Sequence, residues 1–206
     1  MRASTGRSSG RWAAAAVVLG SLGVAGCSAG DSGTAFPVET AATAMSQAAK
    51  ASELPPRPAE LSFTGLDPCD LLAQVQLDEL EVTGVPRRAA DPPDGPTCVF
   101  DVGKTPPFRA YHLRTVGADL QQWLTGARRK SSMTTTPVTV AGYPALTNYR
   151  AGGDPSDCET LVGVAKGQTL AAQAFAISAG ADNQQQLCTM STHAAELAVQ
   201  NLKSRS

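Results

Sequence analysis

The chain has 206 residues and carries 17 basic and 18 acidic side chains, which gives a formal net charge of −1. This balance argues against nucleic acid as a partner, because nucleic-acid binding depends on clustered Lys and Arg that neutralise phosphates. Hydrophobic residues make up 42% of the chain but aromatic residues only 5%, so we expect one modest core in a single domain.

The N-terminus has the pattern of a bacterial lipoprotein signal. Arg2, Arg7 and Arg11 precede an apolar run, Trp12 to Val24, which is shorter than the roughly 20 residues of a transmembrane helix. Val24-Ala25-Gly26-Cys27 then resembles a lipobox, so residues 1–26 are predicted to be a signal peptide. The alternatives are an ordinary cleaved signal peptide or an uncleaved anchor.

The lipobox resemblance implies that Cys27 receives diacylglycerol and an amide-linked third chain, with palmitate among the acyl groups. Two or three chains anchor a protein stably. We therefore expect an exported chain on the outer face of the cytoplasmic membrane, with the membrane and the lipoprotein-processing enzymes as partners. Without the three signal arginines, 14 basic and 18 acidic residues remain, a formal charge near −4.

Residues 27–60 are expected to comprise the lipidated Cys27 and a flexible tether, because Ser, Gly, Ala, Thr and Pro dominate them. Such a tether reaches on the order of 30 Å. Within it, Gly30-Asp31-Ser32-Gly33 resembles the nucleophile loop of chymotrypsin-like proteases. A serine nucleophile needs a base and a rigid oxyanion hole, so chance explains this match better.

Four cysteines remain once Cys27 is assigned to the lipid: Cys69, Cys98, Cys158 and Cys188. An even number outside the cytoplasm indicates two disulfides. Three pairings are open, and we favour Cys69 with Cys98 and Cys158 with Cys188, because each closes a local loop of about 30 residues. There is no C-x-x-C pair, which argues against zinc and thiol redox catalysis.

The folded domain is predicted to span residues 61–206 and to begin with a helix. Asp67 is a suitable cap and Pro68 fits the first helical position, while Leu72, Val75 and Leu80 form the expected apolar stripe. Strands are predicted over 97–102 and 108–116, with Tyr111 and Leu113 pointing inward.

A middle helix is expected over 118–130, and its apolar stripe comprises Leu120, Trp123, Leu124 and Ala127. Arg128, Arg129 and Lys130 complement its C-terminus; alternatively, these three cations form a docking patch for anionic lipid or wall polymer.

Short β segments follow over 138–141, 145–149, 159–165 and 169–177. Gly142 marks a tight corner and Lys166-Gly167-Gln168 a hairpin turn. The last helix is expected to start near Asp182 as its cap, and to bury Leu187, Met190, Ala194, Leu197 and Leu202. The predicted class is α+β: an antiparallel sheet of about five or six strands, packed by N-terminal, middle and C-terminal helices.

The sequence offers little support for catalysis. Its two histidines, His112 on a strand and His193 on the last helix, have no sequence-local carboxylate or nucleophile beside them. Asp78-Glu79 and the pair Asp154 and Asp157 are interpreted as a helix end or solvated turns. We predict no catalytic, cofactor-binding or metal-ligating residues.

Several landmarks together resemble the actinobacterial lipoproteins of the domain-of-unknown-function family DUF3558. They are the lipobox, the low-complexity tether, Asp67-Pro68-Cys69 with Leu71-Leu72, Cys98 followed by Phe100, the segment 138–145, Cys158 at a strand start and Cys188 in a C-terminal helix. The resemblance covers roughly Leu66 to Leu202. It implies an α+β domain on the outer face of the cytoplasmic membrane, and no shared activity.

Three functional hypotheses remain. The first and favoured one is a non-enzymatic envelope module that binds a protein or wall component through a sheet face or loops. The second is a carrier of lipid or another apolar ligand, which requires an apolar cavity between sheet and helices. The third is an enzyme whose site the sequence does not reveal.

Overall fold

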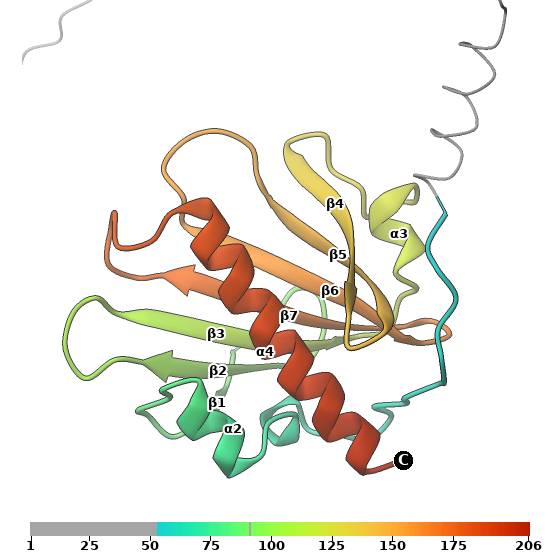
Figure 1. Cartoon of the computed structure of the whole chain (residues 1–206), viewed down its shortest axis with the longest axis horizontal. Helices are drawn as coiled ribbons and strands as arrows, with labels where there is room; N and C mark the ends of the chain where they lie inside the picture. Colours follow the sequence, from blue (N-terminus) through green and yellow to red (C-terminus); the bar gives the residue numbers. More distant parts are fainter. Residues whose placement is uncertain (1–52, 91) are drawn as a thin grey trace, which may run out of the picture. The chain divides into compact units, whose positions relative to one another are not determined.

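A computed structural model describes residues 53–90 and 92–206 as a seven-stranded antiparallel sheet with short helical segments and one long helix (Figure 1). The strands are β1 Arg87–Arg88, β2 Thr97–Val102, β3 Arg109–Val116, β4 Met133–Val140, β5 Tyr143–Arg150, β6 Asp157–Ala165 and β7 Gln168–Ala176. The helices are η1 Pro68–Asp70, α2 Gln74–Glu79, α3 Gln121–Leu124 and α4 Gln184–Ser204. The strand order is β1-β2-β3-β7-β6-β5-β4. The α+β class is thus confirmed.

The sheet has seven strands rather than the predicted five or six. The additional strand is β1, whose two residues pair with Val99 and Cys98 at the sheet edge. Two residues are too few to show an alternation of polar and apolar side chains, so the sequence pattern gives no signal for this strand.

Helix α4 lies diagonally across one face of the sheet (Figure 1). It forms the main core with residues from β2, β3, β5, β6 and β7. Alanines on both sides, such as Ala198 on α4 and Ala172 on β7, are fully buried and let the helix approach the strands closely. The predicted helix residues Leu187, Ala194, Leu197 and Leu202 are buried, and Met190 is half-buried.

The cap of α4 is Asn183, not the predicted Asp182. The Asn183 side chain accepts from the Gln186 amide at 2.9 Å, and the Gln186 side chain accepts from the Asn183 amide at 2.8 Å. This reciprocal pair satisfies two otherwise unpaired amides. Asp182 instead receives two hydrogen bonds of 2.8 Å from Arg109, because its buried carboxylate needs a charged partner.

A second, smaller cluster packs on the opposite face of the sheet. Its buried members are Val116, Leu120, Trp123, Leu146, Leu161 and Ala171. Leu54 packs against this cluster, and the Leu61 amide donates to the Val164 carbonyl at 2.9 Å. The described end of the predicted tether therefore contacts the domain.

The predicted middle helix over 118–130 is wrong in length, because only Gln121–Leu124 is helical. Leu120 and Trp123 are buried as expected, whereas Ala127 is exposed. Gly126 disfavours the continuation of a helix by about 1 kcal/mol, and a Cβ there would lie 2.7 Å from the Cα of Gln122. The cations after α3 therefore do not lie in the last turn of a helix.

The N-terminal helix is also shorter than expected. Asp67 caps a single 3-10 turn, with Pro68 at its start, and α2 begins only at Gln74. Val75 is exposed and Leu77 is buried, so the expected stripe through Val75 is wrong.

Both predicted hairpin turns are present. Ala141 and Gly142 join β4 to β5 with positive φ values of 50° and 88°, which suits a tight two-residue turn. Gly167, at φ 67°, joins β6 to β7. Pro137 lies in β4, at the edge of the sheet, where its missing N–H removes no bond to an inner strand.

Two disulfides connect the sheet to the elements that cover it. Cys69 at η1 is bonded to Cys98 in β2, and Cys158 in β6 is bonded to Cys188 in α4. These are the two pairings with loops of 29 and 30 residues. Cys98 and Cys158 are fully buried, so both bonds are anchored in the core.

The Asp67 cap predicts a pH-dependent contribution to stability. The Cys69 amide, and then Arg88, hold the pKa of Asp67 below its ordinary value of 3.8. Because the folded-state pKa is lowered, the stabilisation is present above pH 3.8 and is lost as the pH falls through the folded-state value. We expect Asp67→Ala to destabilise the domain by about 1 kcal/mol at neutral pH and less in acid. Urea unfolding between neutral pH and pH 2 measures this; a difference that grows in acid contradicts it.

Candidate interaction surface

The sheet face opposite α4, here called the open face, carries a row of polar side chains. Strand alternation directs His112 away from the core face, which holds its neighbours Tyr111 and Leu113. The cross-strand register continues this row from β2 to β4 through Val99, His112, Gln173, Glu159, Asn148 and Thr135. All but Val99 have polar side chains.

Arg114 and Glu159 form an ion pair at the centre of the open face. Arg114 Nη2 donates to Glu159 Oε1 at 2.8 Å and to Gln173 Oε1 at 3.1 Å. The side chains of Arg114 and Glu159 are only 12% and 14% exposed, so this pair is largely removed from water. Among the described residues, the buried Arg114 Nε has no hydrogen-bond partner.

The electrostatics of Glu159 follow from this burial. Desolvation raises the pKa of its carboxyl group, while the Arg114 charge and a hydrogen bond with Asn148 oppose that rise. The Asn148 side chain is itself oriented by Thr135, whose hydroxyl donates to Asn148 Oδ1 at 2.9 Å. The ionised form of Glu159 therefore depends on Arg114 and on polar neighbours from β4 and β5.

The polar network extends to the start of β6. Gln173 Nε2 donates to Asp157 Oδ2 at 2.7 Å, and the Ser156 hydroxyl donates to Asp157 Oδ1 at 2.9 Å. The interpretation of Asp157 as part of a solvated turn is therefore wrong, since Asp157 is the first residue of β6 and is fixed by its neighbours.

One end of the open face is aromatic and apolar. The rings of His112 and Phe175 are 4.5 Å apart. Burial, followed by the charges of Arg114 and Arg87, lowers the pKa of His112, which favours the neutral imidazole. Phe108 and Ile177 are exposed and are joined by the Ile177 amide, which donates to the Phe108 carbonyl at 3.0 Å. We call Phe108, His112, Phe175 and Ile177 the aromatic patch.

The other end is bounded by α3 and by the loop that precedes β2. Asp94 in this loop accepts from Arg128 at 2.8 Å and lies 3.4 Å from Arg114. The Arg128 guanidinium lies over the Trp123 ring, 4.9 Å from its centroid. A chain of charges therefore connects the segment after α3 to the centre of the open face.

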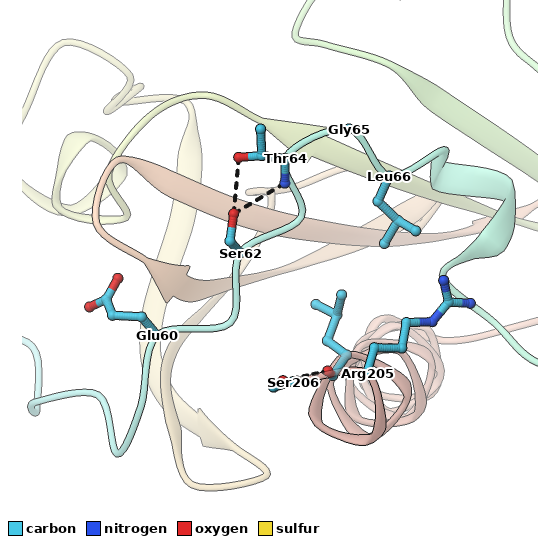
Figure 2. A pocket seen from close by; sticks show the side chains of 8 residues that line it. Glu60, Ser62, Thr64, Gly65, Leu66, Arg205 and Ser206 are labelled. Carbon is cyan, nitrogen blue, oxygen red and sulfur yellow. Dashed lines mark hydrogen bonds between the residues drawn. The ribbon is translucent and has the colours of Figure 1, made fainter.

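A separate hollow of about 460 Å³ lies between residues 60–66 and the end of α4 (Figure 2). Leu66 and Leu202 line it together with Ser62 and Thr64, whose hydroxyls are 2.9 Å apart. The charged side chains that line this hollow already have partners within the domain. Arg205 donates to the Asp70 carbonyl at 2.7 Å, and Glu60 pairs with Arg57. We therefore regard the open face as the stronger candidate.

The structure does not bring the two histidines together. His112 lies on the open face, whereas His193 on α4 is 3.0 Å from Glu79 at the end of α2. Cys27 and the Gly30-Asp31-Ser32-Gly33 motif lie outside the described residues. Sequence analysis missed Arg114 and Glu159. The predicted strand over 108–116 does contain a signal for Arg114. Strand alternation places Arg114 on the sheet face opposite to that of the inward residues Tyr111 and Leu113.

Within residues 53–90 and 92–206, no group of three or more His, Cys, Asp or Glu side chains is arranged to hold a metal ion. In the same residues no helix is long and apolar enough to cross a membrane.

The fold and the open face define a disulfide-linked α+β domain with a polar sheet surface. Over residues 22–201 the sequence matches the family described as protein of unknown function DUF3558, and the chain belongs to this family. No curated protein and no solved structure matches the chain.

Proposed function

We propose that this chain is an exported lipoprotein of the cell envelope, acylated at Cys27, whose domain is a non-enzymatic binding module. The open face is the contact surface, and its partner is an envelope protein or a wall component. The membrane holds the chain through its N-terminal lipid.

The N-terminal sequence and the disulfides support the export part of the proposal. Basic residues, a short apolar run and Val24-Ala25-Gly26-Cys27 follow the order of a lipoprotein signal. Both disulfides are embedded in the core, and stable disulfides are typical of oxidising compartments.

The observation that carries the binding part is the polar row with the exposed residues of the aromatic patch beside it. Helix α4 fills the other face of the sheet with buried side chains, whereas Phe108 and Ile177 are 40% and 61% exposed. Exposed apolar residues beside fixed polar groups are a common feature of interaction sites. The buried Arg114 and Glu159 keep the polar row rigid, which lowers the entropic cost of binding.

A photo-crosslinkable residue at position 177 tests this proposal in living cells. The matched control is position 75, because Val75 is also β-branched and is 71% exposed, but lies on α2. We expect a discrete crosslinked product from position 177 and none from position 75, as judged by mass spectrometry. Equal products from both positions, or products from position 75 alone, would contradict the open face as the contact surface.

A further inference from the structure

Three exposed cations gather at one corner of the domain. Arg129 and Lys130 follow α3, and Arg150 ends β5. The Met133 amide donates to the Lys130 carbonyl at 3.1 Å, and Met133 is the cross-strand partner of Arg150. The backbone therefore places all three residues, here called the cationic corner, around the start of β4.

The cationic corner is not neutralised within the described part of the chain. Arg128, the neighbouring cation, is paired with Asp94 and lies over Trp123. The side chains of Arg129, Lys130 and Arg150 are exposed, and no described carboxylate lies within 4.0 Å of their charged atoms. The loop that follows Arg150 contributes a single acid, Asp154. The corner thus presents positive charge on a domain with excess acid overall.

The chain enters the domain next to α3. Glu53, the first described residue, lines a hollow together with Leu54, Leu120 and Gln121. Leu54 packs against the cluster that contains Leu120 and Trp123, and Figure 1 shows the first described residues next to α3. Helix α3 precedes Arg129 and Lys130 in the chain, whereas Pro144, which lines the same hollow, and Arg150 lie at opposite ends of β5.

We infer that the cationic corner docks on the anionic headgroups of the membrane that holds the acylated Cys27. This inference rests on the proposed lipid anchor. The 26 residue steps between Cys27 and Glu53 limit the separation of the domain from the bilayer to about 90 Å. Tethering raises the local concentration of lipid headgroups, so a few cations suffice within about 8 Å of the surface at physiological salt.

Trp123 provides the readout. The sequence contains two tryptophans, Trp12 and Trp123. Removal of residues 1–26 leaves Trp123 as the single tryptophan, and it lies on α3, just before the cationic corner in the chain. The lipidated chain is reconstituted in vesicles whose headgroups carry a spin-label quencher. We expect stronger quenching of Trp123 in vesicles that contain phosphatidylglycerol than in vesicles of phosphatidylcholine alone, and weaker quenching at high salt.

Charge variants test whether the quenching of Trp123 depends on the cationic corner. Each cation removed from the cationic corner should lower the ratio of docked to undocked protein about fivefold, so Arg129→Gln with Lys130→Gln should abolish most of the quenching. The control, Arg87→Gln with Lys104→Gln, removes the same formal charge from exposed positions on β1 and in the loop between β2 and β3. Quenching that survives in the first variant, or that is lost equally in the control, would overturn the inference.

Vesicle flotation separates the two claims. Protein that floats with phosphatidylcholine vesicles carries its anchor, and equal Trp123 quenching in both lipid mixtures then overturns docking alone. Protein that does not float overturns the anchor, and with it the docking. Binding of the cationic corner to a soluble polyanion without any dependence on anionic lipid would assign it to a wall polymer and would also overturn the inference.

Discussion

Replacement of Cys158 and Cys188 together by alanine is expected to lower the free energy of unfolding by about 3 to 4 kcal/mol. The bond closes a loop of 30 residues and restricts the unfolded chain, and it also fixes α4 to β6. Denaturant unfolding of the oxidised protein, compared with the variant, measures the effect.

The second disulfide is the matched control for this experiment. Replacement of Cys69 and Cys98 by alanine removes a bond that closes a loop of 29 residues, so the chain-entropy term is nearly the same. Similar losses in both variants would agree with stabilisation through the unfolded state. A loss below about 1 kcal/mol in both variants would contradict a stabilising role for these bonds.

Arg114→Met is expected to destabilise the domain by about 3 kcal/mol, because it leaves Glu159 buried without its cation. The pKa of Glu159 is already raised by burial, and loss of Arg114 raises it further. The stability deficit of Arg114→Met should therefore shrink as the pH is lowered, since protonation removes the unpaired charge. Chemical unfolding at several pH values measures both effects.

The double variant Arg114→Met with Glu159→Leu separates the ion pair from its burial cost. We expect it to recover most of the stability that Arg114→Met loses, since two apolar side chains leave no buried charge. A double variant that is less stable than Arg114→Met alone would show that the ion pair is itself the main source of stability.

The strands were the most predictable part of the fold, but the prediction of 138–141 was wrong at its start, since β4 spans Met133–Val140. Proline-rich turns before each strand predicted β2 at its observed bounds and β3 to within one residue. Positive-φ turns at Gly142 and Gly167 follow from glycine placement between strands. These features depend on local backbone preferences, which sequence patterns report directly.

The helices were less predictable because tertiary contacts decide where they end. The segment after Leu124 leaves the helix, and Arg128 pairs with Asp94, which is distant in sequence. Asp182 is likewise recruited by Arg109, 73 residues away, so Asn183 becomes the cap. Single-sequence reasoning has no access to such partners.

The sequence predicted the binding surface only in general terms, as a sheet face or a set of loops. Arg114 and Glu159 are 45 residues apart in the sequence. They come together because β3 and β6, the strands that carry them, both pair with β7. The strand order, which no local pattern specifies, therefore creates the polar row. In the sequence, an Arg and a Glu on separate strands have the same pattern as ordinary charged residues on the protein surface.

The intact mass of the native protein, isolated from membranes, tests the central claim most directly. We predict a chain that starts at Cys27, carries the mass of its acyl groups, and lacks the four hydrogens of Cys69, Cys98, Cys158 and Cys188 in two disulfides. A chain with an unmodified N-terminus, or with free thiols at all four positions, would contradict the account of an anchored envelope protein.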